Sequence, residues 1–404
     1  MASPPRTVDD HRAVVAALLS SSPVDDVPLA QARGRVLAAD VVAAVSLPSF
    51  DNSAMDGYAV RAAELVGASQ AHPVELPVAT DIPAGRVDVP PMEPGTVHRI
   101  MTGAPMPEGA DAVVPVEQSD GGVARVRLHA APAPAAHVRF EGEDVTLGDV
   151  VLTAGTVLGP AQIGVAAAVG SATVPVRRRP TVLVLSTGSE LIAPGTPLRR
   201  GQIYESNGPM LAAAVEDAGG VAELLRFVPD DVEVFLAMMR ERAAGADLVL
   251  TSGGVSAGAY EVVKDAFTGR GVEFVKVAMQ PGGPQGAGRL DGGVAVVTLP
   301  GNPVSAQVSF EVFVRPALRA AMGHPYPARP VVSATLSERM TSPPGRRQFR
   351  RGVVDAAAGT VREVGSPASH LLGALARADC LIVVPEDVTE LHAGATVDLW
   401  LLEG

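Results

Sequence analysis

Two short glycine-rich segments, each lying between an apolar β-like run and a helical pattern, constrain this chain more than any other feature. The first, residues 251–258 (TSGGVSAG), follows the run 246–250, and the second, residues 299–305 (LPGNPVS), follows the run 294–298. Such strand–loop–helix units place backbone N–H groups at the carboxyl edge of a parallel sheet, where a helix N-terminus can hold an anion. The sequence therefore predicts an α/β sheet that binds a phosphorylated ligand at this edge.

Length and composition limit what surrounds these loops. A chain of 404 residues is too long for one ordinary hydrophobic core, so we expect several domains. Hydrophobic residues make up 47% of the sequence but aromatic residues only 3%, so the cores are expected to consist of Val, Ala and Leu. The formal net charge of −12 argues against nucleic acid as a general partner, because binding a phosphate backbone needs a basic face. An anionic small ligand therefore requires a local positive pocket.

Cysteine usage and the N-terminal residues bear on the compartment. The single cysteine, Cys380, excludes an internal disulfide framework and fits a reducing environment. Its apolar neighbours predict an inert core residue. The first residues show no basic segment followed by an apolar stretch, and no apolar run approaches the roughly 20 residues that a membrane helix needs. We therefore expect a soluble cytoplasmic protein without a membrane partner.

Changes in the sequence pattern divide the chain into four expected domains. Residues 46–140 are dense in Pro and Gly and contain short apolar runs, which is typical of a β-rich insertion domain. This insertion interrupts a discontinuous, mostly helical domain, formed by residues 1–45 together with 141–176. Its helices are expected at 9–20, from Pro28 to near Gly34, and from Pro160 to Gly170. The arginines at 177–179 mark the next boundary, and we expect a solvated linker there.

The other two domains follow from a change of periodicity. Within residues 177–326, unbroken Val- and Leu-rich runs alternate with helical stretches, which predicts a mostly parallel sheet covered by helices on both faces. The expected strands are 181–185, 221–228, 246–250, 272–277 and 294–298, and the expected helices are 207–218, 231–244, 260–268 and 303–320. Residues 327–404 are β-rich and are expected to form a small barrel or sandwich. The fold class is therefore multidomain α/β with a central α/β/α sheet.

Several polar residues at predicted loop positions have two interpretations each. Glu190 follows the strand 181–185, where it could bind Mg²⁺ beside a phosphate or simply begin a helix. Lys276 ends a strand, where it could meet an anion or be a surface lysine with a partly buried stem. The acidic segments that contain Asp56 and Asp144 could be functional or could be plain turn formers.

The densest basic cluster lies in the C-terminal domain. It contains Arg346, Arg347, Arg350 and Arg351. Alternation along a strand would place Arg347 and Arg351 on one face and the other two on the opposite face, so one face could bind an anion. The eight histidines show no metal-ligand spacing, and no Ser–His–Asp set can be identified. The sequence gives no case for covalent catalysis.

A set of motifs occurs in a fixed order over nearly the whole chain. They are 48–60 (PSFDNSAMDGYAV), 99–105 (RIMTGAP), 142–144 (GED), 186–191 (STGSEL), the two glycine-rich segments, and Ser369-His370. Together they make the chain resemble the molybdopterin molybdenumtransferase family of the bacterial MoeA type, which is related to the C-terminal domain of gephyrin. The resemblance implies four domains including a molybdopterin-binding-like α/β domain, an elongated shape, and a homodimer with its active-site cleft between subunits. An isolated monomer should then be poorly active.

The resemblance also implies a reaction. Molybdate would be inserted into the dithiolene of adenylylated molybdopterin, with Mg²⁺-dependent cleavage of the adenylate and release of AMP. Cleaving a phosphoanhydride depends mainly on positioning and charge stabilisation. Backbone amides, Mg²⁺ and carboxylates therefore suffice without a nucleophilic side chain.

Site residues follow from the same resemblance. The polar positions of the family match Asp56, Thr102, Asp144, Glu190 and Asp230, and a basic position near the molybdate matches Lys276. Among these, Asp56, Asp144 and Glu190 are the expected metal ligands. The residues expected to hold the substrate are Ser252, Gly253, Gly254, Ser256 and Gly258 in the first loop, Pro300, Gly301, Asn302 and Pro303 in the second, and Arg346 and Ser369 in the C-terminal domain.

The chain departs from the family pattern in two places. After residue 258 the family usually has an Asp, Tyr and Lys arrangement, whereas this chain has Glu261 as a substitute at best. Gln280 and Gly283 occupy two positions where lysine is typical. Losing two cations should weaken attraction for a dianion, because each buried charge-assisted contact contributes about 1.5–3 kcal/mol. A paralogue of altered efficiency, or one that prefers tungstate, therefore stays open.

Two other functions also stay open at this point. A nucleotide pyrophosphatase of the competence-damage type could use the same middle domain, although the motif at 50–60 and the C-terminal β domain argue against it. A degenerate paralogue or gephyrin-like scaffold could bind molybdopterin without turnover, which the missing lysines favour.

Overall fold

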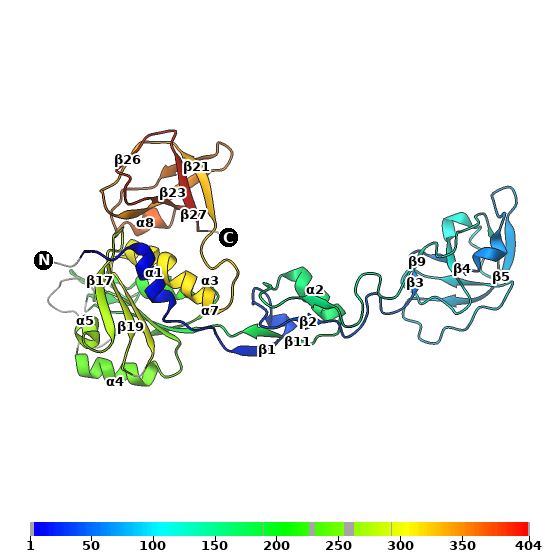
Figure 1. Ribbon diagram of the computed structural model, residues 1–404, viewed down its shortest axis with the longest axis horizontal. Coiled ribbons are helices and arrows are strands. Elements are labelled where there is room, and N and C mark those ends of the chain that lie inside the picture. Colours follow the sequence, from blue (N-terminus) through cyan, green and yellow to red (C-terminus); the bar gives the residue numbers. More distant parts are fainter. Residues whose placement is uncertain (1–3, 189, 226–230, 254–261, 292, 403–404) are drawn as a thin grey trace.

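The computed structural model describes residues 4–188, 190–225, 231–253, 262–291 and 293–402, and the chain is elongated (Figure 1). A central α/β domain and a C-terminal barrel lie together at one end. A small linking domain occupies the middle, and a β-rich domain forms the far end. The chain leaves the central domain after its N-terminal helix and returns through the linking domain. The linking domain and the β-rich domain therefore form one insertion in the sequence of the central domain.

A 6-stranded sheet in the order β15-β12-β16-β20-β19-β17 forms the middle of the α/β domain. Its strands are β15 (Val221–Leu225), β12 (Thr181–Ser186), β16 (Leu248–Ser252), β20 (Ala295–Leu299), β19 (Pro284–Arg289) and β17 (Val272–Lys276). The first four are parallel, and every residue of β16 and β20 is buried. Burial from both faces explains why these runs are apolar without alternation. The predicted, mostly parallel sheet is confirmed.

Helices cover both faces of this sheet. On one face lie α3 (Asn207–Asp217), α6 (Pro303–Ser309) and α7 (Arg315–Ala321), and on the other lie α4 (Val232–Arg242) and α5 (Val262–Phe267). Leu211 and Val308 share the first core with Val184 of the sheet. Phe235 and Phe267 form the second core, with ring centroids 5.6 Å apart. The α/β/α layering is therefore as the alternating pattern predicts.

Strand β19 was not predicted, because two glycines give it the composition of a loop. It is antiparallel to both of its neighbours. A Cβ atom at Gly286 would lie 2.1 Å from Thr298 Oγ1, and one at Gly288 would lie 2.0 Å from the carbonyl oxygen of Gly271. The glycines thus allow close approach between neighbouring chain segments, which composition alone does not reveal.

Helix α1 (Val8–Ala16) belongs to the central domain. Thr7 caps it by accepting a hydrogen bond from the Asp10 N–H at 3.1 Å. Val8 and Val15 are buried in the same core as the central sheet. This packing differs from the expected place of the helix in the discontinuous domain, because an apolar helical face does not reveal which domain it packs against.

The prediction that the discontinuous domain is mostly helical was also wrong. This linking domain contains α2 (Pro160–Ala168) and the antiparallel pairs β1 (Val24–Pro28) with β11 (Thr173–Arg177) and β2 (Val41–Val42) with β10 (Val150–Leu152). The helix expected from Pro28 is a single 3₁₀ turn at Leu29–Gln31. Alternate residues Val174 and Val176 are buried, which is the period of a strand. The exact domain boundaries stay a prediction.

The β-rich insertion contains a 5-stranded sheet in the order β7-β4-β6-β5-β8. The strands are β4 (Gly57–Val60), β5 (Val74–Ile82), β6 (Val97–Ile100), β7 (Ala112–Pro115) and β8 (Arg125–Leu128), and the short pair β3 (Asn52–Ser53) and β9 (Val138–Arg139) lies nearby. Tyr58 is fully buried and anchors the core, with its hydroxyl donating to the Gly122 carbonyl at 3.0 Å. The predicted β-rich character is confirmed.

The C-terminal domain is a closed barrel. Its strands are β21 (Val331–Leu336), β23 (Arg347–Asp355), β24 (Thr360–Glu363), β25 (Cys380–Val384) and β27 (Thr396–Leu401), and pairing of β23 with β25 closes it. Arg350 is buried against Glu363, with both contacts at 2.7 Å. Cys380 is fully buried, and burial raises the pKa of its thiol to about 12, consistent with an inert core residue.

A buried ionic cluster fixes the junction of the central domain with this barrel. Glu311 lies in a π-helical segment, Phe310–Val314, between α6 and α7. It accepts hydrogen bonds from Arg329, the residue shortly before β21, at 2.9 and 3.2 Å. Arg315 and Arg329 both reach Asp217 at the end of α3. Strand β18 (Met279–Gln280) adds a parallel pairing to β23.

The arginines at 177–179 do not form a solvated linker, which corrects the prediction. All are partly buried. Arg179 donates to the carbonyls of Gly219 and Gly220, and Arg178 pairs with Asp247 at 2.6 Å. Multiple donors on a rigid guanidinium suit this use as a tether between domains. Among the described helices, none has the length and apolarity to cross a membrane.

Stability in acid provides a test of the packing of α1. His11 is fully buried, its ring stands perpendicular to Phe313 at 4.7 Å, and neither ring nitrogen has a hydrogen-bond partner among the described residues. Burial, aided by Arg6 and opposed by Glu273, lowers the pKa of His11 from 6.5 to about 4. The unfolded chain therefore takes up a proton before the folded chain does. The free energy of unfolding therefore keeps its full His11 contribution above pH 6.5. Towards pH 4 it falls by at most about 3 kcal/mol.

We expect His11→Leu to reduce the total loss of stability in acid. The measurement is the midpoint temperature of calorimetric unfolding at pH values on either side of that window. A slope should remain from His324, whose pKa burial and Arg319 lower to about 4. The exposed His72 provides the control His72→Leu, which should leave the slope unchanged. An unchanged slope in His11→Leu would contradict the assignment.

Candidate active site

The two glycine-rich loops lie side by side at the carboxyl edge of the central sheet. Ser252 at the end of β16 is in register with Leu299 at the end of β20, and the Gly253 N–H donates to the Leu299 carbonyl at 3.0 Å. Asn207, the first residue of α3, joins the loops. Its Nδ2 donates to Ser252 Oγ at 2.7 Å and to the Gly301 carbonyl at 2.6 Å. One amide thus fixes the spacing of both loops.

The start of the first loop requires glycine. Gly253 has a φ of 93°, and a Cβ atom there would lie 3.0 Å from the Thr187 carbonyl oxygen. A Cβ atom at Gly301 would lie 3.4 Å from the Gly253 Cα. Positive φ and close approach both favour glycine. Four of the predicted residues, Gly254, Ser256, Gly258 and Asp230, lie outside the described residues, as does Glu261.

The C-terminal domain contributes to the second loop. Asn302 Nδ2 donates to Ser369 Oγ at 3.0 Å, and the Val304 N–H near the start of α6 donates to the Ser369 carbonyl at 3.2 Å. Pro303 occupies the first turn of α6, where its missing N–H costs nothing. Together with Pro300, whose carbonyl accepts from Ser252 Oγ at 3.4 Å, these contacts place the predicted second-loop residues and Ser369 at one edge.

Glu190 does not begin a helix. It precedes β13 (Leu191–Ile192), which pairs with β14 (Ile203–Tyr204), and its carbonyl accepts from the Ile203 N–H at 3.0 Å. The exposed carboxylate lies over Gly188, where a Cβ atom would be 2.7 Å from either oxygen. The helix-start alternative is therefore wrong, and the carboxylate remains available at the edge next to Ser252.

Lys276 and Arg346 lie on segments that meet. Lys276 is exposed at the end of β17, and its carbonyl accepts from the Arg6 N–H at 2.8 Å. Arg346 is exposed in the turn before β23, and the next residue, Arg347, donates through its N–H to the Ala278 carbonyl at 3.0 Å. The side chain of Arg347 is used structurally, in pairs with Asp9 and Glu386.

The two positions that lack the typical lysines lie on this segment. Gln280 accepts a hydrogen bond from Gln348 at 3.3 Å, and a Cβ atom at Gly283 would meet no atom closer than 3.5 Å. There is therefore space for a side chain at residue 283.

A second group of predicted residues lies at the opposite end of the elongated molecule (Figure 1). These residues belong to the β-rich domain and to its neck, the segment that joins it to the linking domain. Asp56 Oδ1 accepts from the Thr102 N–H at 2.6 Å and from Thr102 Oγ1 at 2.8 Å. These bonds lower the pKa of Asp56. Asp144 is exposed at the neck, where its N–H donates to the Leu47 carbonyl at 3.0 Å.

The predicted metal ligands do not meet within one chain. No group of three or more His, Cys, Asp or Glu side chains gathers into a metal site in the described ranges. Glu190 lies in the central domain, whereas Asp56 and Asp144 belong to the distal group. A shared site therefore requires a second copy of the chain.

Sequence reasoning missed Asn207 and Thr187. Both follow strands of the central domain, and Asn207 is the first residue of α3, directly after the N-cap residue Ser206. The only available signal was its place at the same sheet edge as the two glycine loops.

Family models match almost the whole chain. Residues 6–170 match the MoeA N-terminal region (domain I and II), residues 183–320 a probable molybdopterin binding domain, and residues 333–402 the MoeA C-terminal region (domain IV). A protein of Mycobacterium tuberculosis named molybdopterin molybdenumtransferase 2 is 57% identical over 402 residues, 98% of this chain and 99% of that protein. The chain belongs to the molybdopterin molybdenumtransferase family.

Other members of the molybdopterin molybdenumtransferase family are similar over the same length. Molybdopterin molybdenumtransferase 1 of M. tuberculosis is 37% identical over 422 residues, with 98% of this chain and 99% of that protein covered. A crystal structure of a molybdopterin biosynthesis MoeA protein from Pyrococcus horikoshii has a TM-score of 0.83 at 30% identity, covering 99% of this chain and 100% of that chain. The chain is therefore a transferase of molybdenum cofactor biosynthesis, as the resemblance implied.

Removing the Asn207 amide tests the loop arrangement. Asn207→Ala leaves Ser252 Oγ and the Gly301 carbonyl without their shared donor, which should cost about 1–3 kcal/mol of local stability. We expect faster hydrogen–deuterium exchange in residues 252–253 and 299–301, measured by mass spectrometry. Gln202→Ala, which removes an exposed-loop contact to Arg199 before the same helix, should leave exchange there unchanged. Equal exchange in wild type and Asn207→Ala would sink the bridging role.

Proposed function

We propose that this chain inserts molybdate into adenylylated molybdopterin in the cytoplasm, with Mg²⁺-dependent release of AMP. The observation that carries the proposal is the edge formed by Ser252, Gly253 and Gly301, which Asn207 holds together. An edge where parallel strands end in glycine-rich loops suits the phosphorylated tail of a pterin. The names of the relatives supply molybdopterin and molybdenum as the chemistry.

The carboxylates fit a site for Mg²⁺, which prefers oxygen ligands. Asp56, Asp144 and Glu190 are all exposed, and the Thr102 hydrogen bonds favour the ionised form of Asp56 that a cation needs. Bound Mg²⁺ would neutralise charge on the phosphoanhydride. In this proposal Thr102 orients Asp56, Lys276 attracts the molybdate, and Arg346 and Ser369 bound the substrate from the C-terminal domain.

A homodimer would unite the two groups of residues. On the linking domain, Val42 and Val150 are paired across β2 and β10 and are each 51% exposed. Leu147, 63% exposed, lies close by, with its N–H donating to Ser46 Oγ at 3.2 Å. An apolar face of this kind is suited to burial against a second copy. In the dimer, the distal domain of one subunit would complete the edge of its partner.

Turnover assays test the proposed reaction directly. Protein supplied with adenylylated molybdopterin, Mg²⁺ and molybdate should release AMP and yield active cofactor. Glu190→Gln should lower turnover by about a hundredfold. Glu241→Gln, at an exposed position in the last turn of α4, is the matched control and should retain activity. Substituting tungstate for molybdate measures the anion preference.

Other outcomes of this assay identify the alternatives. Tight substrate binding without AMP release would replace the proposal by a non-catalytic molybdopterin-binding protein. Cleavage of generic dinucleotides, with no dependence on molybdopterin, would replace it by a nucleotide pyrophosphatase.

Mixed dimers test the division of the site between subunits. Asp56→Asn and Glu190→Gln chains, carrying different affinity tags, can be co-expressed and the heterodimer purified. One of its two clefts would then contain both native carboxylates, so activity should recover to about half that of wild type. Each mutant homodimer should stay inactive.

A second heterodimer controls this experiment. In a dimer of Asp56→Asn with Asp144→Asn, each subunit has one altered carboxylate in its β-rich domain or neck. Neither cleft is then native, so activity should not recover. If the first heterodimer also stays inactive, the site lies within one chain and the shared cleft is wrong.

A further inference from the structure

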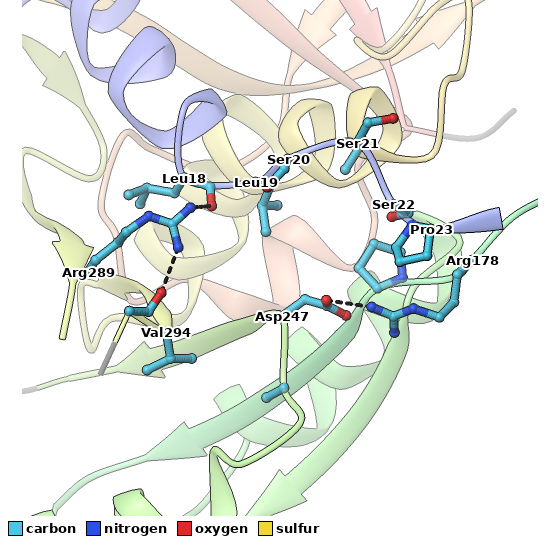
Figure 2. A pocket seen from close by; sticks show the side chains of 14 residues that line it. Leu18, Leu19, Ser20, Ser21, Ser22, Pro23, Arg178, Asp247, Arg289 and Val294 are labelled. Atoms are coloured by element: carbon cyan, nitrogen blue, oxygen red, sulfur yellow. Dashed lines mark hydrogen bonds and ion pairs between the residues drawn. The ribbon is translucent and has the colours of Figure 1, made fainter. Parts of the chain in front are cut away.

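A cavity of about 360 Å³ lies at the amino edge of the central sheet (Figure 2). Pro180, Asp247 and Val294, which stand just before β12, β16 and β20, form part of its wall. The glycine loops follow the other ends of the same strands. Since a strand of five residues spans about 15 Å, the cavity is separate from the proposed active site. Its volume is at the small end of the range for ligand sites.

Two arginines give the cavity a net positive charge. Arg178 pairs with Asp247 at 2.6 Å, and the other oxygen of Asp247 accepts from the Thr181 N–H at 2.7 Å, so this carboxylate is fully engaged. Arg289 contributes a second guanidinium, and its neighbour Asp291 pairs with Arg270 instead. Within the described parts of the chain, Arg289 therefore has no carboxylate partner. The balance is one uncompensated positive charge in a protein of net charge −12.

Arg289 is held in place without being neutralised. It donates to the Gly293 carbonyl at 2.6 Å and to the Leu18 carbonyl at 2.7 Å, as Figure 2 shows. A guanidinium has five N–H donors in a fixed fork, so donors remain for a further acceptor. A preorganised fork loses little freedom when it binds a planar or tetrahedral oxyanion.

Serines line the cavity between the two arginines. Ser20, Ser21 and Ser22 follow α1, and the backbone of Ser22 is engaged on both sides, with its N–H donating to Ala321 and its carbonyl accepting from Arg177. These two contacts fix the segment that carries the three hydroxyl groups. Hydroxyls and guanidinium N–H groups are the donors that proteins offer to phosphate and carboxylate groups.

We propose that this cavity binds a small organic anion, through a phosphate or carboxylate group held by Arg289 and the serine hydroxyls. The cavity wall includes residues 18–23 together with Arg178 and Pro180, which belong to the two connections between the central and linking domains. The ligand would therefore contact both segments that carry the distal domains. This site is independent of the proposed transferase reaction.

Calorimetric titration with citrate and with inorganic phosphate, at matched ionic strength, tests the proposal and distinguishes carboxylate from phosphate recognition. Wild type should bind at least one of them saturably. Arg289→Gln should weaken binding by about tenfold or more, the effect of losing roughly 1.4 kcal/mol. Arg127→Gln, which removes an exposed arginine of the β-rich domain, should bind as wild type does.

A second pair of variants protects the test against misfolding of Arg289→Gln. Ser20 is exposed. Ser20→Glu places a negative charge at the cavity and should abolish binding, whereas Ser20→Gln, of the same size and neutral, removes only one hydroxyl donor and should weaken binding by about threefold. Absence of saturable binding in wild type, or equal affinity of both Ser20 variants, would overturn the proposal.

Discussion

One side-chain amide, that of Asn207, determines the geometry on which the proposed chemistry depends. The ends of parallel strands reach a common edge by topology alone, but topology does not fix the spacing between the loops that follow. Asn207 does so by donating to Ser252 and to the Gly301 carbonyl, at 2.7 and 2.6 Å. Ser369 then ties the second loop to the barrel. The edge is thus a joint product of four segments far apart in the sequence.

The chain separates its charges as well as its domains. Amide-rich loops and Lys276 occupy the central domain, and Asp56, Thr102 and Asp144 occupy the distal end and its neck. Within one chain, Asp56 and Asp144 are therefore far from the edge that carries the glycine loops and Glu190. The junctions support this arrangement, because Arg178 and Arg179 tether the linking segment and the Glu311–Arg329 pair fixes the barrel. Burying an ion pair gives little net stability, but breaking one is costly, so such pairs define geometry.

Local sequence patterns predicted the central layer well because they report burial and backbone conformation directly. The runs around β12, β16 and β20, and the glycine at 253, were readable in this way. Tertiary relationships were not. The apolar face of α1 gave no sign that it packs on the central sheet, and the glycines of β19 resembled a loop because the close approach of neighbouring chain segments leaves no mark in composition. Asn207 and Arg179 were missed for the same reason, since their partners are distant in sequence. The distal acids came from family resemblance alone.

The π-helical segment Phe310–Val314 has a consequence for how this family member can change. Each residue of an α-helix advances about 100° around the axis, so one extra residue in a turn re-phases everything beyond it. Here the phase change lets α6 begin after Asn302, which contacts Ser369, while α7 presents Arg315 to Asp217. Deleting a single residue from this segment would restore regular winding and turn Arg315 away from Asp217. The number of residues in this helix therefore cannot change by even one without altering its contacts.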